Sequence, residues 1–339
     1  MTRSQKKQVF LPLLALALSL CLGFGEAATG LPRPVKLVWH YYKVTNTCHD
    51  AEVYVRHQVN LSWHNDKSVT AKLLRLVSTD CLVTGCDASI LLDGENSEKN
   101  AAQNRGLGGF VLIDNIKTVL EDRCPGVVSC ADILHLATRD AVHLAGGPSY
   151  PVFTGRRDGT TSSASSVDIP SPSISLDQAL SYFKSKGLDE EDMTILLGAH
   201  TMGKTFCRFI EDRLYNFNGT KKADPSMDKK LVAEMRGKCP PRLRQGQGDP
   251  TVYLNPENGN SYKFTNSYYS NLLENKAVLG IDQQLKFGPT TADISNQTAY
   301  NFELFRKAFA LSISRLGSFN VLTGKEGQIR HNCRHINNK

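Results

Sequence analysis

The sequence predicts an all-α domain held together by disulfide bonds. Three observations support this fold class: several long segments repeat apolar residues every three or four positions, strand-like alternation is scarce, and eight cysteines follow an amino-terminal apolar segment. The chain has 339 residues, of which 40% are hydrophobic and 22% are charged. Such a chain is long enough for one large domain or two lobes, and its composition is typical of soluble globular proteins.

The helical period is clearest in five segments, and glycine or proline residues stand near their ends. These segments are residues 111–124, 131–147, 175–187, 205–217 and 300–317. We expect at most a short hairpin within residues 150–159, and loops at 160–173 and 242–266. The chain has no internal repeat and no linker long enough to separate independent domains, so all segments are expected to form one domain.

The first 28 residues have the features of a secretory signal peptide. A basic start is followed by an apolar run at residues 9–24 and by small residues around Ala27 and Ala28, where cleavage is expected. A membrane anchor is the alternative, but the run is short and is interrupted by a proline and a glycine. We therefore expect residues 1–28 to be a signal peptide, residues 29–339 to form the mature domain, and the protein to be secreted.

The cysteine content agrees with secretion. Nine cysteines are present, and removal of the signal peptide, which contains Cys21, leaves an even number. An even number of cysteines in a secreted chain predicts disulfide bonds rather than a thiol nucleophile. No two of them are spaced as CxxC, which argues against a zinc site. Eight cysteines allow many pairings, so the spacing alone leaves the connectivity open.

The charge pattern and the glycosylation motifs describe the expected surface. The net charge is +7, but basic residues are scattered, which argues against nucleic-acid binding and allows weak attraction to acidic polysaccharide. Asn60, Asn218 and Asn296 each begin an N-x-S/T sequon. No stretch after the signal peptide is apolar enough to span a membrane, and we expect a monomer that does not bind membranes.

A histidine in the sequence LLGAHTMGK is a candidate ligand. His200 lies between Gly198 and Gly203, whose lack of side chains would let a flat, bulky group approach the imidazole. Single histidines are more often ordinary core or surface residues, so this motif alone is weak. Asp282, in LGIDQQL, is a candidate to accept a hydrogen bond from the other ring nitrogen, which would fix the tautomer of a ligating histidine. Nothing in the sequence proves that the two residues meet.

Residues 73–92 combine an ordinary helical segment with a loop rich in oxygen ligands. Asp80, Asp87 and Ser89 surround a short loop between Cys81 and Cys86. Calcium takes six to eight oxygen ligands in flexible geometry, and a tight loop with two carboxylates supplies several of them. The alternative is a solvated acidic turn that a disulfide closes.

Long stretches of the chain resemble the plant secretory (class III) haem peroxidases. The similarity runs from about residue 37 to residue 336 and includes TNTCHDAE, GCDASILLDG, EDRCPGVVSCADIL, TGRRDG, GAHTMGK, RLYNF and VLTGKEGQIRHNCR. It implies an all-α, two-lobed haem peroxidase fold with very little β structure and haem b between the lobes. It also implies four disulfide bonds: Cys48–Cys124, Cys81–Cys86, Cys130–Cys333 and Cys207–Cys239.

The resemblance assigns roles to individual residues. It implies that His200 binds the haem iron, that Asp282 is its hydrogen-bond partner, and that Pro170 lies at the edge where donors bind. It implies a distal calcium site formed by Asp80, Val83, Gly85, Asp87, Ser89 and Glu98. At the second, proximal calcium site Thr201 matches, but Asn255 and Thr265 replace aspartates and the loop is longer by about two residues, so we expect no ion there.

The chain departs from the family in the first half of residues 73–92. The family reads Arg-Leu-His-Phe-His-Asp-Cys where this chain has residues 75–81, RLVSTDC. Arg75 and Asn104 match catalytic positions, but Thr79 replaces the distal histidine that moves a proton between the peroxide oxygens. Loss of a general acid–base group typically costs about 10²–10⁴ in rate. Ser78 replaces a phenylalanine, which predicts a wider and wetter pocket.

Two functions therefore remain open. The first is a secreted, extracellular or cell-wall peroxidase that oxidises small phenolic donors with hydrogen peroxide, in hydrogen peroxide breakdown and the response to oxidative stress, with an impaired peroxide step. The second is a non-catalytic haem-binding or cell-wall protein on the same scaffold. We do not expect His135 or His143 to replace the missing histidine, because nothing in the family pattern directs either toward the iron.

Overall fold

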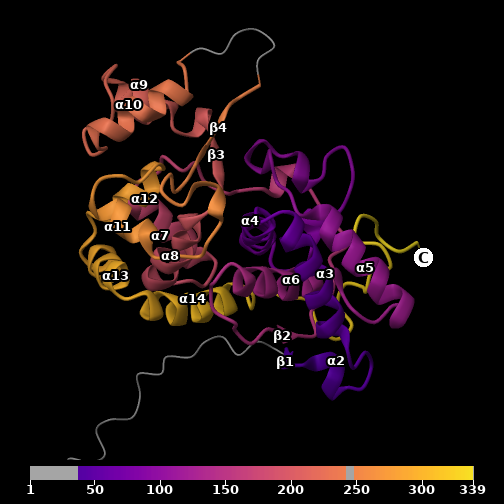
Figure 1. Ribbon diagram of the computed structural model, residues 1–339. Coiled ribbons are helices and arrows are strands. Elements are labelled where there is room, and N and C mark those ends of the chain that lie inside the picture. Colours follow the sequence, from indigo (N-terminus) through magenta and orange to yellow (C-terminus); the bar gives the residue numbers. More distant parts are fainter. Residues whose placement is uncertain (1–36, 242–247, 339) are drawn as a thin grey trace, which may run out of the picture. The chain divides into compact units, whose positions relative to one another are not determined.

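Helices carry almost all of the regular structure, as the sequence predicts (Figure 1). The computed structural model describes residues 37–241 and 248–338. The predicted signal peptide, residues 1–28, lies outside the described residues, so its removal stays a prediction. The described residues belong to one compact unit by their internal contacts.

The first group of helices is built around α6, which is buried from Cys130 to Val142. The Ser129 hydroxyl caps this helix by accepting a hydrogen bond from the Asp132 N–H. α3 and α4 pack against α6, and α3 also packs against α5. The helices of this group are α2 (Tyr41–Val44), α3 (Ala51–Asn65), α4 (Val69–Val83), α5 (Phe110–Arg123) and α6 (Cys130–Leu144).

The second group of helices follows in the chain and forms the other lobe, in which α8 packs against α13 and α14 (Figure 1). The stacked rings of Phe264 and Phe305, with centroids 4.9 Å apart, contribute to its core. Its helices are α7 (Leu176–Ser185), α8 (Glu190–Leu197), α9 (Glu211–Tyr215), α10 (Lys229–Lys238), α11 (Ser267–Leu273), α12 (Gly280–Gln284), α13 (Pro289–Tyr300) and α14 (Phe302–Leu316). The two groups confirm the predicted all-α, two-lobed fold.

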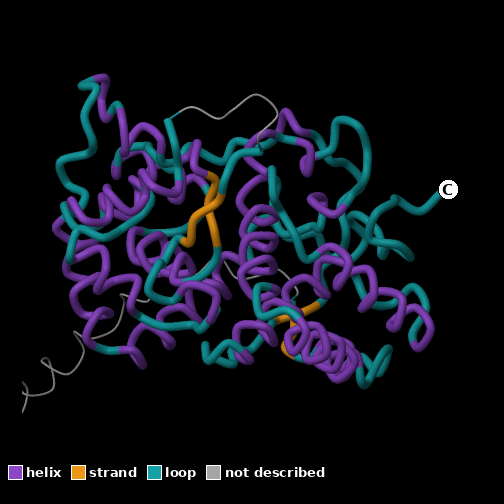
Figure 2. Tube along the Cα trace, turned by 45° about the horizontal axis from the view of Figure 1, so that its top comes forward, coloured by secondary structure: helices purple, strands orange, loops and turns teal. Residues whose placement is uncertain are grey.

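Strands form only two short antiparallel pairs in the described residues (Figure 2). β1 (Val38–Trp39) pairs with β2 (Phe153–Thr154), and β3 (Lys204–Phe206) pairs with β4 (Thr251–Tyr253). The predicted hairpin within residues 150–159 is wrong, because β2 finds its partner at the start of the described chain.

The predicted helix at residues 205–217 is correct only in its second half. Residues Glu211–Tyr215 form α9, whereas the apolar start of the segment belongs to β3. The Cys207 N–H donates a hydrogen bond to the Pro250 carbonyl at 2.9 Å, which extends the pairing of β3 with β4. The partner strand lies within the predicted loop at residues 242–266, so long-range pairing overrides the local helical period here.

All four disulfide bonds implied by the resemblance are present. The bond between Cys130 and Cys333 joins the start of α6 to the carboxyl-terminal segment across a sequence separation of 203 residues. A loop of this length stabilises the folded state by about 4–5 kcal/mol in the chain-entropy description. The other bonds are Cys48–Cys124, Cys81–Cys86 and Cys207–Cys239.

Two surface predictions can be compared with the fold. No helix among residues 37–241 and 248–338 is long and apolar enough to cross a membrane. Asn60, Asn218 and Asn296 are all exposed, as an acceptor for glycosylation must be, although glycosylation itself stays a prediction.

Candidate functional site

His200 and Asp282 meet, which the sequence alone did not establish. α8 continues into a 3₁₀ turn, Gly198–Thr201, that carries His200, and α12 of the same lobe brings Asp282 beside it. His200 Nδ1 lies 2.9 Å from Asp282 Oδ1, and the carboxylate is only 2% exposed. This pairing leaves His200 Nε2 as the nitrogen available to a ligand.

Asp282 makes His200 more basic. Burial lowers the pKa of His200, but the charge of Asp282 and its hydrogen bond outweigh this effect, so that the pKa is raised. Tyr268 donates a second hydrogen bond to Asp282 Oδ1 at 3.0 Å, which holds the carboxylate in place. Tyr268 could not be predicted from the sequence, because only the fold shows that α11 packs against α12.

The two glycines around His200 have different surroundings. A Cβ atom on Gly198 would lie 2.5 Å from Tyr269 Oη and 2.7 Å from the Phe305 ring, so protein side chains occupy the space beside it. Gly203 has a φ of +102°, a conformation that favours glycine. The expectation that both glycines make room for a flat group is therefore wrong for Gly198.

Arg75 and Thr79 lie on α4, in the other lobe. Arg75 Nη2 donates hydrogen bonds to the carbonyls of Gln103 at 3.0 Å and Arg105 at 3.3 Å. The charge of Arg75 acts to lower the pKa of His200, which indicates that the two side chains are near one another across the lobes. Thr79 is buried, and its hydroxyl is no acid or base near neutral pH.

Asn104 joins the Arg75 region to the loop that follows α4. Its Nδ2 donates a hydrogen bond to the Glu98 carbonyl at 2.7 Å. Its Oδ1 is buried and has no hydrogen-bond partner in the part of the chain that the structure describes. The asparagine is therefore held in place by one end, and its acceptor end is free to receive a donor.

The structure shows the surroundings of the two histidines of α6, which we do not expect to replace the missing one. His135 is buried, with Nε2 3.5 Å from Cys81 Sγ, and burial lowers its pKa well below the usual range. Cys81, Cys86 and His135 lie close enough to hold a metal, but the two sulfurs are joined in a disulfide bond. His143 is exposed.

The distal loop, residues 80–98, gathers buried carboxylates. Asp80 and Glu98 are fully buried, and both Glu98 carboxylate oxygens lack a hydrogen-bond partner among the described residues. Burial, and next the charge of Asp87, raise the pKa of Asp80 well above its usual range. Burial also raises the pKa of Glu98 to about 7. Partly unpartnered, mutually repelling carboxylates fit a site for a divalent cation.

Further predicted ligands of the distal loop are close by. The Ser89 hydroxyl is buried and lies 3.1 Å from Thr84 Oγ1, while the Ser89 N–H donates to Asp87 Oδ1 at 3.0 Å. The Gly85 carbonyl accepts a hydrogen bond from the Asp87 N–H. The Val83 carbonyl faces Lys186 Nζ at 3.3 Å, so this oxygen already has a cationic partner.

The predicted proximal site is a network of neutral groups, which we call the proximal network. Asn258 Nδ2 donates to the carbonyls of Thr201 at 2.7 Å and Lys263 at 2.6 Å. The amide nitrogen thus lies between two carbonyl oxygens and donates to both of them. The network consists of Thr201, Asn255, Asn258, Thr265, Ser267 and Asn271.

Both predicted proximal substitutions take part in this network. Asn255 donates to Ser267 Oγ at 2.8 Å and accepts from Asn271 Nδ2 at 3.0 Å. The hydroxyls of Thr201 and Thr265 are 3.0 Å apart. These groups carry no charge and satisfy one another, so they do not fit a calcium ion.

Pro170 lies on a half-buried loop that touches both lobes. Upstream of it, the Val167 carbonyl accepts a hydrogen bond from Gln103 Nε2 at 3.3 Å. Downstream, the Pro172 carbonyl accepts one from the Ile281 N–H at 2.8 Å. The loop therefore connects Gln103, which precedes Asn104, with Ile281, which precedes Asp282.

Comparisons with known proteins agree with this geometry. Residues 55–301 match the family model described as "Peroxidase", a range that contains Arg75, Thr79, Asn104, His200 and Asp282. The chain is 63% identical to "Probable peroxidase 61" of Arabidopsis thaliana over 330 residues, which cover 97% of each protein. It is 63% identical to "Probable peroxidase 26" of the same plant over 312 residues, covering 92% of this chain and 93% of the relative.

A more distant relative is the "Lignin-forming anionic peroxidase" of Nicotiana tabacum, which is 41% identical over 297 residues. That alignment covers 86% of this chain and 90% of the relative. The family match spans more than half of the chain, the relatives align almost from end to end, and the disulfide bonds and lobes have the arrangement implied by the resemblance. The chain belongs to the plant peroxidase family.

Proposed function

We propose that this chain is a secreted haem peroxidase that oxidises small phenolic donors with hydrogen peroxide, and that it reacts with peroxide slowly because Thr79 stands at the position of the distal histidine. Family membership and the His200–Asp282 pair support the first part. Haem b, when bound, supplies the iron that reduces peroxide and then oxidises donors. Such an activity outside the cell or in the cell wall would remove hydrogen peroxide under oxidative stress.

His200 is the residue that we expect to hold the haem iron. Its Nδ1 is hydrogen-bonded to Asp282, which favours the tautomer in which Nε2 has a lone pair for the metal. The hydrogen bond of Tyr268 fixes the position of Asp282. The donor set therefore fits a haem ligand. A His200→Ala variant should lose stable haem binding, and an unchanged Soret band in that variant would overturn the assignment.

The proton-transfer step carries the second part of the proposal. Arg75 provides a fixed positive charge that can stabilise the oxygen leaving the peroxide. Thr79 has no group that takes up and returns a proton near neutral pH. The observation that carries this proposal is Asn104 Oδ1, a buried acceptor without a donor among the described residues. It is the group expected to orient a histidine ring, and here it has no ring to orient.

The proposal also includes a binding edge for phenolic donors near Pro170 and one bound calcium ion. The loop around Pro170 spans both lobes and is partly exposed, so it can present the edge of the haem region to a phenol. The distal loop would hold one calcium ion, and the proximal network none. The scattered positive charge would allow weak adsorption to acidic cell-wall polysaccharide.

Restoring the histidine tests the proposal. We expect Thr79→His to raise the rate at which peroxide changes the Soret band by at least tenfold, which is about 1.4 kcal/mol of barrier. Adding Ser78→Phe should raise it further, since a dry pocket positions peroxide better and neighbouring residues seldom act independently. The measurement is stopped-flow absorbance with purified, haem-containing protein, with Thr79→Gln as the matched polar control.

Each other outcome has a definite meaning. If the unchanged protein already reacts as fast as the histidine variant, Thr79 does not impair the peroxide step. If the protein binds haem but neither it nor the histidine variant reacts with peroxide, a non-catalytic haem-binding or cell-wall protein becomes the better description. If it binds no haem, the assignment of His200 fails as well.

A further inference from the structure

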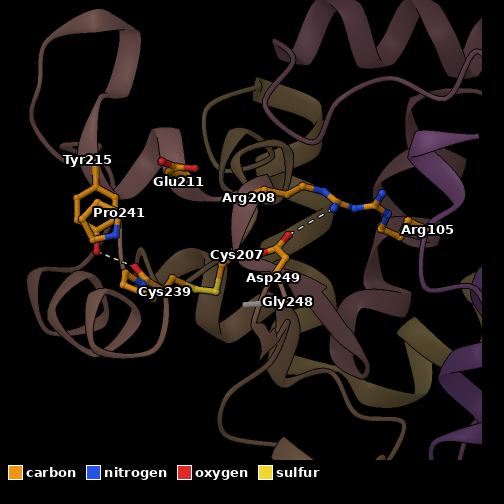
Figure 3. Close-up of a pocket in the computed structure, with 10 residues that line it drawn as sticks. Arg105, Cys207, Arg208, Glu211, Tyr215, Cys239, Pro241, Gly248 and Asp249 are labelled. Carbon is orange, nitrogen blue, oxygen red and sulfur yellow. Dashed lines mark hydrogen bonds and ion pairs between the residues drawn. A yellow bond between two sulfur atoms is a disulfide. The ribbon is translucent and has the colours of Figure 1, made fainter. Parts of the chain in front are cut away.

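A cavity of about 390 Å³ lies beside the Cys207–Cys239 disulfide bond, and two arginines line it (Figure 3). Figure 3 shows the side chains of Arg105 and Arg208 pointing toward one another from different parts of the chain. Like charges facing each other destabilise a site unless an anion or a carboxylate lies between them. Asp249 is the one carboxylate in contact with either guanidinium among the described residues, with Oδ2 3.5 Å from Arg208 Nη1.

Arg208 is held rigidly. Its guanidinium stacks on the rings of Phe206 and Phe209, each at 4.7 Å. Phe206 is itself fixed, because its ring packs so closely on Gly106 that a Cβ atom there would lie 2.8 Å away. Arg208 Nη2 is buried and has no hydrogen-bond partner in the described part of the chain. The guanidinium is thus held in place by the two rings, and one of its buried N–H groups has no acceptor among the described residues.

Arg105 completes the pair and connects it to the proposed peroxide pocket. Its side chain is exposed and makes no ion pair with any described residue, while its backbone carbonyl accepts the hydrogen bond from Arg75. Burial, and next the charge of Arg208, lower the pKa of Arg75, which indicates that these two guanidiniums are near one another. Both arginines that line the cavity are therefore neighbours of Arg75, one through its charge and the other through its backbone carbonyl.

We propose that Arg105 and Arg208 form a binding site for the carboxylate of a phenolic acid donor. Guanidinium groups bind carboxylates through paired, charge-assisted hydrogen bonds, and two of them facing each other match one carboxylate. The cavity has the size of a small-molecule site, and Tyr215 and Pro241 add apolar wall. Glu211 and Asp249 also line it, so that a single negative charge is favoured over a polyanion.

This inference rests on the proposed function, because it names the class of donor that the peroxidase prefers. The test compares two donors that differ in one group, 4-hydroxycinnamate and 4-hydroxycinnamyl alcohol. Calorimetry measures the Kd of each for the haem-containing protein, and steady-state oxidation gives kcat/KM for each. The variant is Arg105→Gln, which removes one exposed charge, and the control is Arg123→Gln, an exposed arginine at the end of α5.

We expect the unchanged protein to bind the acid at least tenfold more tightly than the alcohol. Arg105→Gln should weaken acid binding tenfold or more and lower the acid-to-alcohol ratio of kcat/KM by a similar factor, mainly through KM. Arg123→Gln should leave this ratio unchanged. Because Arg105 is at the surface, its variant is expected to fold, and circular dichroism verifies this.

Three results would overturn the inference: equal affinity for acid and alcohol, an unchanged ratio in Arg105→Gln, or displacement of the acid by phosphate at equal concentration, which would indicate an unselective anion site. Failure of the proposed function looks different. If neither donor is oxidised but acid binding still depends on Arg105, the carboxylate site stands and the peroxidase activity does not.

Discussion

The distal loop and the proximal network are the two regions that the resemblance relates to calcium sites, and their chemistry is opposite. In the distal loop, Asp80, Asp87 and Glu98 bring carboxylates together, and Glu98 leaves both oxygens without a hydrogen-bond partner among the described residues. In the proximal network, amides and hydroxyls bond to one another, and Asn258 bridges two backbone carbonyls.

The difference indicates that buried carboxylates and neutral amides place different demands on a cation. Buried carboxylates repel one another and require a positive partner, whereas an asparagine supplies both donors and an acceptor. The distal loop adjoins the helix that carries Arg75, where a fixed charge is needed. The proximal network adjoins His200, whose position Asp282 and Tyr268 already secure.

Removal of calcium should have the largest effect on stability, and this effect should come from the distal loop alone. Elemental analysis should find one calcium ion per chain rather than two, and chelation should lower the Tm by about 5 °C or more, because the ion binds only the folded state. The Soret band should report that His200 still holds the haem. Two ions per chain, or none, would contradict the comparison.

Loss of the Asn258 side chain should reduce stability less than removal of calcium does, and added calcium should not restore it. Asn258→Ala removes the amide that donates to both carbonyls and leaves the partly buried carbonyl of Thr201 unsatisfied, at a cost of about 1–3 kcal/mol in the free energy of unfolding, whereas water can replace the amide at the exposed carbonyl of Lys263. Denaturant unfolding with and without added calcium measures this. Asn260→Ala is the matched control, since Asn260 is exposed in the same loop. Recovery of stability by calcium would show that Asn258 only displaces an ion.

A negative charge placed in the proximal network should lower the free energy of unfolding by as much as Asn258→Ala does, or by less. Asn255→Asp adds a buried carboxylate beside Ser267 and Asn271, which destabilises the fold unless a cation binds. We expect no second calcium ion by elemental analysis, because Asn258 still fills the space between the carbonyls. A second ion in this variant would show that charge alone was missing.

The smallest expected effect is a pH dependence confined to the distal loop. In calcium-free protein the pKa of Glu98 is raised from 4.5 to about 7, so the folded state binds protons more readily than the unfolded state. The stability that comes from the raised pKa of Glu98 is fully present below about pH 4.5 and is lost as the pH rises through about 7. Chelation should therefore lower the Tm more at about pH 8 than at about pH 5. A Glu98→Gln variant should show less of this difference.

Local signals in the sequence predicted the fold well. Helices such as α6 and α14 follow a strong apolar period, and the motif similarity implied every disulfide bond correctly. The failures are nonlocal. The segment before α9 has a helical period but pairs as β3, because a strand distant in the sequence supplies its hydrogen bonds.

The predictions about the site succeed and fail for the same reasons. His200 and Asp282 were predicted as partners from a family pattern, and the fold brings them together. Tyr268 and Asn258 were missed, because a tyrosine in an apolar helix and an asparagine in a polar loop have many uses. Their roles depend on which backbone and carboxylate oxygens the fold brings near them, and no sequence spacing encodes that.

The bond between Cys130 and Cys333 also constrains how the protein is made. At roughly 5–20 residues per second, the ribosome releases Cys130 roughly 10–40 seconds before its partner, which lies 203 residues later. During that interval the thiol of a central helix waits beside earlier cysteines with which it must not pair. A chain that stops before residue 333 can still form the bond between Cys48 and Cys124, but it lacks the covalent tie between α6 and the carboxyl-terminal segment.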